Sequence, residues 1–158
     1  MPKDTADYRI GRSRPGLGLG LFACRKYRNG EQIVEYSGNR ILTRLADNLP
    51  TRYLFEISKE WTVDGSPRSN VARYINHSCD PNCETDIEDE KIFVYASRAI
   101  DIGEELAFDY GEEYFDEFIR PYGCKCAACA QKSGFTRGFY ALPIKRPEAN
   151  TSAPPKTT

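Results

Sequence analysis

The sequence predicts one β-rich α+β domain, on three observations. Short apolar or alternating runs recur along the middle of the chain, and Gly, Asn and Asp turn residues separate them. Helical signals are few and short. Strands and helices do not alternate as repeated βαβ units would, so we expect no Rossmann fold. A length of 158 residues suits one domain with short tails.

Six strands are predicted from these runs. They are Leu21–Cys24, Gln32–Tyr36, Arg40–Leu42, Tyr53–Ile57, Trp61–Val63 and Lys91–Ser97. The last run alternates, with Ile92 and Val94 on one face and Phe93 on the other. Asn29-Gly30 is a strong turn signal between the first two strands, and Asp101–Gly103 predicts a turn after the last.

Three short helical segments complete the prediction. Thr43–Asn48 suits one or two turns, with Thr43 as the N-cap and a stop before Pro50. Val71–Ile75 suits a single turn, and Glu112–Ile119 suits a short amphipathic helix.

Charge and hydropathy restrict the function classes. The chain has 22 Lys and Arg against 23 Asp and Glu, a balance that argues against a general nucleic-acid binder. No apolar run approaches the ~20 residues that cross a bilayer, and the first ten residues lack the apolar core of a signal peptide. We therefore expect a protein of the cytosol or nucleus, with flexible residues 1–7 and a disordered tail from about residue 143.

Three of the six cysteines lie in one short run, Cys124-Lys-Cys126-Ala-Ala-Cys129. Clustered thiols inside a cell more often bind metal than form disulfides, and zinc prefers four thiolate or imidazole ligands. The run supplies three ligands, so a fourth must come from elsewhere. Its candidates are Cys24, Cys79, Cys83 and His77, and spacing alone does not choose between them. The alternative is three free thiols in a loop, which would be prone to oxidation.

Residues 73–83 read Arg-Tyr-Ile-Asn-His-Ser-Cys-Asp-Pro-Asn-Cys and hold His77, the only histidine of the chain. A single histidine is more often structural than catalytic, and without a second histidine or a nucleophile it builds no triad. Cys79 or Cys83 would suit a Cys–His nucleophile, but the expected zinc competes for one of them.

Two further segments carry weak signals when each is taken alone. Gly16-Leu-Gly18-Leu-Gly20 lacks the Lys-Ser/Thr of a phosphate loop and precedes a strand, so it is either a tight turn or a place where a ligand approaches the backbone. Residues 104–111, Glu-Glu-Leu-Ala-Phe-Asp-Tyr-Gly, either end a strand that buries Phe108 or contribute to a site.

Taken together and in order, these segments resemble the SET-domain family of protein-lysine methyltransferases. The matching segments are Gly18-Leu-Gly20-Leu-Phe22, Glu35-Tyr36-Ser37-Gly38, Arg73-Tyr-Ile-Asn76-His77-Ser-Cys79-Asp-Pro-Asn82 and Glu105-Leu-Ala-Phe108-Asp109-Tyr110-Gly111. The cysteine run is similar to the family's post-SET zinc segment, although its spacing is C-x-C-x2-C rather than the commoner C-x-C-x4-C. The resemblance implies a SET domain over residues 8–111, a post-SET zinc segment over 112–135 and a tail over 136–158.

The resemblance also implies a fold of small β-sheets in which the C-terminal motif passes under a loop and forms a pseudoknot. The Asn-His and Asp-Tyr motifs would meet at that crossing. S-adenosylmethionine would lie on one face of it, and the target lysine would enter a channel from the other.

Site residues follow from the resemblance by position. The implied cofactor-binding residues are Gly18, Leu19, Gly20, Tyr53, Arg73, Asn76, His77 and Tyr110. The implied lysine channel consists of Tyr36, Tyr53, Phe108 and Tyr110, with Tyr110 and Tyr36 as catalytic residues. A phenylalanine at position 108 implies di- or trimethylation. One structural zinc would be bound by Cys79, Cys124, Cys126 and Cys129.

The implied partner is a protein or peptide that carries the target lysine, such as a histone tail or another basic protein, with no membrane and no direct nucleic-acid partner. The chain would then act in the cytoplasm of a bacterium, in eukaryotic chromatin, or in a host cell as a secreted effector. Two alternatives stay open: a catalytically inactive SET-like module that binds peptides, and a zinc-stabilised structural or nucleic-acid-associated domain.

Overall fold

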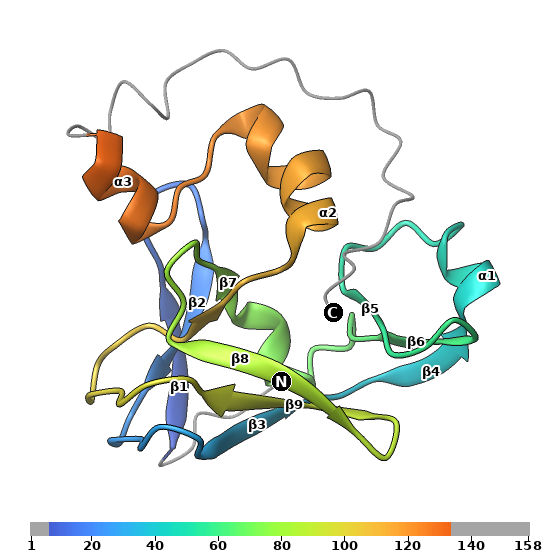
Figure 1. The fold of residues 1–158 in the computed structure, drawn as a ribbon, viewed down its shortest axis with the longest axis horizontal. Helices are drawn as coiled ribbons and strands as arrows, with labels where there is room; N and C mark the ends of the chain where they lie inside the picture. Colours follow the sequence, from blue (N-terminus) through green and yellow to red (C-terminus); the bar gives the residue numbers. More distant parts are fainter. Residues whose placement is uncertain (1–6, 134–158) are drawn as a thin grey trace.

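The computed structural model describes residues 7–133. Within this range ten short strands form four small sheets, two with two strands and two with three. The expected β-rich α+β class and the expected small β-sheets are confirmed. Figure 1 shows the C-terminal part of the described chain, from α2 to α3, on one side of the sheets.

The strands pair as follows. β1 (Tyr8–Arg12) is antiparallel to β2 (Leu19–Ala23). The second sheet has the order β3 (Gln32–Tyr36), β9 (Lys91–Ala96), β8 (Cys83–Glu88). The third has the order β4 (Asn39–Leu42), β6 (Trp61–Asp64), β5 (Leu54–Glu56). β10 (Ala107–Phe108) is parallel to β7 (Asn76–His77).

The helical elements are all short. They are α1 (Thr43–Ala46), the 3₁₀ turn η1 (Val71–Tyr74), α2 (Glu112–Tyr114), the π-helical turn η2 (Phe115–Ile119), the 3₁₀ turn η3 (Arg120–Tyr122) and α3 (Ala127–Ser133). In the described part of the chain, none of these elements has the length and apolarity that a membrane-spanning helix needs.

All six predicted strands are present, with ends within two residues of the prediction. The Asn29-Gly30 turn also forms, with Gly30 at φ +85°, but the strands on either side of it belong to different sheets. The predicted N-cap is wrong: Thr43 is the first helical residue, and its Oγ1 lies 2.9 Å from Thr62 Oγ1 instead of capping the helix. The predicted flexible N-terminus (apart from residue 7) and the predicted disordered tail lie outside the described residues.

β9 is the central strand of the core. Its side chains Ile92 and Val94 are fully buried, on the face that the alternation predicts. They pack in one cluster with Leu21 of β2, Ile75 and Leu106. Burying each such side chain stabilises the fold by roughly 1.5–3 kcal/mol, and this cluster supports the short strands that have few hydrogen bonds of their own.

The crossing of β7 and β10 depends on one buried side chain, Asn82. Its Nδ2 donates to the Glu105 carbonyl at 2.9 Å, and its Oδ1 accepts from the Ala107 N–H at 2.9 Å. Ser78 N–H donates to the Phe108 carbonyl at 3.1 Å and continues the contact. The Asn-His and Asp-Tyr motifs therefore meet, as the resemblance implies.

Candidate functional site

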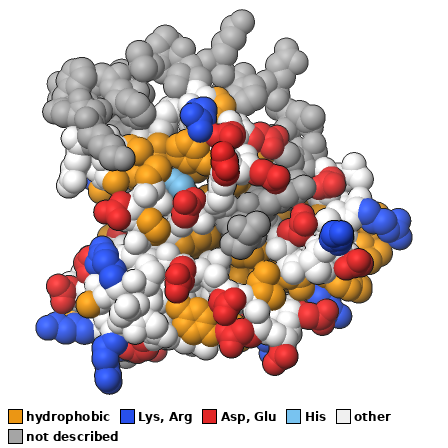
Figure 2. Space-filling model, in the orientation of Figure 1, with side chains coloured by type: hydrophobic (Ala, Val, Ile, Leu, Met, Phe, Trp, Pro, Cys, Tyr) orange, Lys and Arg blue, Asp and Glu red, His pale blue; other side chains and the backbone are white. Residues whose placement is uncertain are grey.

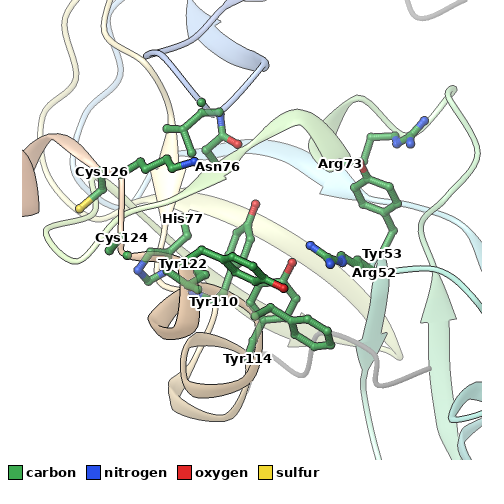
Figure 3. Close-up of a pocket in the computed structure, with 16 residues that line it drawn as sticks. Arg52, Tyr53, Arg73, Asn76, His77, Tyr110, Tyr114, Tyr122, Cys124 and Cys126 are labelled. Carbon is green, nitrogen blue, oxygen red and sulfur yellow. The ribbon is translucent and has the colours of Figure 1, made fainter. Parts of the chain in front are cut away.

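A large cavity opens where the glycine-rich turn, the Asn-His segment and the post-SET part of the chain come together (Figure 3). Its volume is about 590 Å³. The walls are Gly16 and Leu17 from the turn, Arg52, Tyr53, Arg73, Asn76 and His77 from the middle of the chain, and Tyr110, Tyr114, Phe118, Ile119 and residues 122–126 from its C-terminal part. A cavity of this size suits a drug-sized or cofactor-sized molecule.

A second, narrow cavity of about 50 Å³ shares a wall with the first. Its own lining is Tyr36, Leu54, Phe55, Ala72 and Ile75. The shared wall is Arg52, Tyr53, Arg73, Tyr110 and Tyr114. A slender side chain in the narrow cavity would therefore point at a molecule held in the large one.

Tyr110 lies at the centre of the shared wall. Its hydroxyl donates to the Ile75 carbonyl, and its ring lies 5.0 Å from both Phe108 and Tyr114. Figure 3 shows it between His77 on one side and Tyr53 on the other. Burial raises the pKa of Tyr110 well above its usual range, so the side chain is a neutral phenol.

Tyr36 and Tyr53 are joined by a hydrogen bond. The Tyr36 hydroxyl donates to the Tyr53 carbonyl at 3.0 Å, and burial raises the pKa of Tyr36 far above its usual range. The Tyr36 ring fits because residue 65 is glycine: a Cβ there would lie 2.3 Å from a ring carbon. The predicted channel tyrosines are therefore brought together with Tyr110 around the narrow cavity.

Two arginines give both cavities a cationic edge. The Arg73 guanidinium lies over the Tyr53 ring, 4.2 Å from its centroid, and its Nε is buried without a hydrogen-bond partner among the described residues. Arg52 lies 5.1 Å from the Phe118 ring centroid. Within residues 7–133, no carboxylate lines either cavity. An ammonium group entering the narrow cavity would meet positive charge and no counter-ion.

Asn76 connects the glycine-rich turn to the crossing. Its Nδ2 donates to the Leu19 carbonyl and to Glu105 Oε1, each at 2.9 Å. Gly20 leaves room for this carboxylate, since a Cβ there would lie 2.2 Å from Glu105 Oε1 and would displace it. Of the turn, however, Gly16 and Leu17 line the cavity, two residues before the predicted stretch. Contact of Gly18, Leu19 and Gly20 with a cofactor stays a prediction.

Phe108 is behind the site rather than on its wall. Its side chain is buried, lines neither cavity and touches the site through the Tyr110 ring. An effect of Phe108 on the channel would therefore pass through Tyr110 or through a water beside it.

Four cysteine sulfurs lie together at the rim of the large cavity. The Sγ atoms of Cys79, Cys124, Cys126 and Cys129 are all within 4.8 Å of one another. The Cys79 sulfur lies 3.8 Å from that of Cys124 and 3.6 Å from that of Cys129. Four sulfurs bound at ~2.3 Å to a tetrahedral zinc would be roughly 3.8 Å apart, so the residues present suit this ion.

The other candidates for the fourth ligand lie outside this group. Cys83 is buried, and its thiol contacts Asn82 Oδ1 at 3.3 Å. His77 Nε2 lies 3.4 Å from Cys79 Sγ but is not one of the four grouped ligand atoms. Within residues 7–133, the geometry therefore selects Cys79.

Several wall residues were missed by the sequence analysis, namely Arg52, Tyr114, Phe118 and Tyr122. Three of them are aromatics spaced four apart, which places them on one face of the helical run after Gly111. The Tyr114 and Phe118 ring centroids lie 4.9 Å apart, with the ring planes tilted by 42°. The four-residue spacing of these aromatics could have predicted a cavity wall from the sequence. No pattern in the sequence indicates a role for Arg52.

A family model described as SET domain matches residues 18–111. The chain belongs to the SET domain family. Its relatives include histone-lysine N-methyltransferases. The H3 lysine-4-specific enzyme of Schizosaccharomyces pombe is 39% identical over 123 residues, covering 70% of this chain and 13% of that protein. Trithorax of Drosophila virilis is 36% identical over 124 residues, covering 71% of this chain and 3% of that protein.

Solved structures give the same fold. A ctPRC2 structure in an autoinhibited conformation bound to S-adenosylmethionine matches with a TM-score of 0.60 and 31% identity, over 66% of this chain and 15% of that one. An active polycomb repressive complex 2 in the stimulated state matches with a TM-score of 0.61 and 30% identity, over the same shares. This SET domain chain thus spans only a small part of its longer relatives.

Proposed function

We propose that this SET domain chain is an S-adenosylmethionine-dependent protein-lysine methyltransferase. The observation that carries the proposal is the shared wall: a large cavity and a narrow aromatic one meet at Tyr53, Tyr110 and Tyr114. Relatives named histone-lysine N-methyltransferases and a structural neighbour bound to S-adenosylmethionine support it.

The large cavity would hold the cofactor. Asn76 and His77 would contact it on one side, Arg73 at the edge, and Gly16 and Leu17 from the glycine-rich turn. Backbone contacts from Gly18, Leu19 and Gly20 are a further part of the proposal. When bound, S-adenosylmethionine supplies a methyl group activated by its sulfonium. The unpartnered Arg73 Nε–H is a donor available to an anionic group of the cofactor.

The narrow cavity would hold the lysine side chain and favour its neutral amine, with the proton leaving to water. A free lysine has a pKa of ~10.4 and must be neutral to act as a nucleophile. Aromatic walls disfavour the ammonium by desolvation, and the charges of Arg52 and Arg73 disfavour it by repulsion. Tyr110 and Tyr36, both neutral phenols held by backbone carbonyls, would orient the amine rather than act as bases. Positioning of this kind contributes up to ~7–11 kcal/mol in the best cases.

The four-cysteine cluster would hold one structural zinc. The ion would join Cys79, just after β7, to the post-SET cysteines. Because Cys124 and Cys126 also line the large cavity, the zinc would fix that wall.

The substrate class we propose is a lysine of a histone tail or of another basic protein, in chromatin if the source is eukaryotic. Phe108 leaves room for di- or trimethylation because it brings no hydroxyl to hold a water beside the amine.

The test is a methyl-transfer assay with isotopically labelled S-adenosylmethionine against core histones and lysate proteins, using zinc-replete protein. Label on lysine Nζ, located by mass spectrometry and competed by S-adenosylhomocysteine, is the expected result. Cofactor binding without transfer to any of these proteins would favour the inactive peptide-binding module. Absence of cofactor binding would contradict the proposal altogether.

A further inference from the structure

The imidazole of His77 lies between the cysteine cluster and Tyr110, and each ring nitrogen faces one of them. Nε2 is 3.4 Å from Cys79 Sγ. Nδ1 accepts the Tyr110 backbone N–H at 3.1 Å. The side chain is only 6% exposed. No other described residue contacts both groups by hydrogen bonds.

This pair of contacts defines the tautomer. Nδ1 must present a lone pair to the Tyr110 N–H, so the ring proton is on Nε2 and is directed to the Cys79 sulfur. A thiolate, the form of cysteine that binds metal, accepts a hydrogen bond from such an N–H. The Asp109 carboxylate, at 3.7 Å from Nδ1 and largely exposed, is beyond hydrogen-bond distance and does not replace this arrangement.

Packing fixes the ring in this position. Tyr110 contacts it edge-on at 5.5 Å between centroids, and Phe115 contacts it at 5.3 Å. The parallel pairing of β7 and β10 ends at Phe108, whose carbonyl accepts from Ser78 N–H. The bond from Tyr110 N–H to His77 thus extends that pairing by a side chain, just where the proposed catalytic tyrosine begins.

We propose that His77 is a positioning residue that couples the metal cluster to Tyr110. Its Nε2–H would orient the Cys79 thiolate, and its Nδ1 would hold the Tyr110 backbone, so that zinc occupancy orders the tyrosine through one imidazole. The effect on catalysis rests on the proposed methyltransferase function. The tautomer and the effect on zinc do not.

Two substitutions separate the halves of this coupling. In His77→Gln the longer amide places an N–H near the position of Nε2, so it keeps the donor to Cys79 and loses the acceptor for Tyr110. In His77→Asn the amide oxygen lies near the position of Nδ1, so it keeps the acceptor and loses the donor. Cys24→Ser, at a thiol outside the cluster, is the control.

The two variants should differ in zinc retention and in kcat. His77→Gln keeps one zinc per chain with wild-type resistance to a chelator, while kcat falls about tenfold or more and added zinc does not restore it. His77→Asn releases zinc ~10–100-fold more readily, as loss of a bond to a metal ligand does, and excess zinc raises its kcat. Both zinc measurements require no methyl transfer. Parallel changes in the two variants, with no split between zinc retention and kcat, would overturn the coupling.

A measurement on the unaltered protein covers the case in which both variants fail to fold. His77 is the only histidine, so imidazole nitrogen NMR reports this ring alone. The zinc-loaded protein should show the Nε2-protonated tautomer, with resonances that move when cadmium replaces zinc. An Nδ1-protonated ring would refute the proposal, and so would imidazole nitrogen resonances that stay unchanged when cadmium replaces zinc. Either result counts whether or not methyl transfer is detected.

Discussion

The two phenols of the site, Tyr110 and Tyr36, both donate to backbone carbonyls, of Ile75 and Tyr53. Burial raises the pKa of each, so neither ionises in the range where lysine methylation would be measured. The charged side chains on the wall that the two cavities share are Arg52 and Arg73, and no carboxylate lines either cavity among the described residues. These features favour the neutral form of an amine placed in the narrow cavity and provide no side chain to accept its proton.

Phe108→Tyr should shift the product toward monomethyl-lysine. The added hydroxyl can hold a water beside the amine, where a second methyl would otherwise fit, because Phe108 contacts Tyr110 at 5.0 Å. Mass spectrometry of the methylated substrate measures the distribution of product states. Phe93→Tyr, on the opposite face of β9 from the buried core residues, is the control and should leave the distribution as in the wild type. An unchanged distribution in Phe108→Tyr would remove this residue from product control.

The elements that carry the site were predicted to different degrees. β3 and β9 could be predicted from the sequence because apolar side chains repeat along them. β7 and β10 have two residues each, too few for any period, and exist only through the long-range pairing at the crossing. The predicted helix over residues 112–119 is present, but its second half is a π-helical turn. β8 was missed because its outward residues are acidic and its run is not apolar.

Cys129→Ser tests the post-SET element. Loss of one of four thiolates should reduce bound metal well below one ion per chain, since zinc favours four such ligands. Because Cys124 and Cys126 line the large cavity, affinity for S-adenosylmethionine should fall roughly tenfold, a loss of about 1.4 kcal/mol. Metal analysis and titration calorimetry measure the two effects, with Cys24→Ser as the control. Full metal content with unchanged cofactor affinity would show that Cys129 is not a ligand.

For the whole molecule, sequence patterns predicted the fold class and the family resemblance implied the crossing, but neither predicted the extent of the cavities. Motif order identified Asn76, His77 and Tyr110, and the structure places all three on the large cavity. Arg52 and the displacement of the cavity wall to Gly16 and Leu17 had no signal in the sequence, because these residues lie in loops that have no periodic pattern. Cysteine spacing left four candidates for the fourth ligand; the resemblance implied Cys79, and the distances place its sulfur with the other three.

The buried phenols predict how the stability of the whole domain depends on alkaline pH. Burial is the main cause that raises the pKa of Tyr27 and the pKa of Tyr114, each to about 12. Unfolded tyrosines ionise near pH ~10, so above that pH the unfolded state loses protons that the folded state keeps. The free energy of unfolding should therefore be unaffected by these groups below pH ~10 and should fall from there toward pH ~12. Denaturant titrations across this range measure it, and a flat profile would contradict the burial described.

The most direct test of the central claim, that methyl transfer occurs where the two cavities meet, is the single-turnover rate of Tyr110→Phe, measured beside its affinity for S-adenosylmethionine. The substitution removes the hydroxyl bonded to the Ile75 carbonyl and leaves the ring in its aromatic contacts. We predict near-wild-type cofactor affinity and a folded protein whose free energy of unfolding falls by about 1–3 kcal/mol, because the Ile75 carbonyl loses its donor. The transfer rate should fall by about a hundredfold, a loss that a small misplacement at a reacting centre can cause. A near-wild-type rate would show that the chemistry does not depend on this wall and would contradict the account.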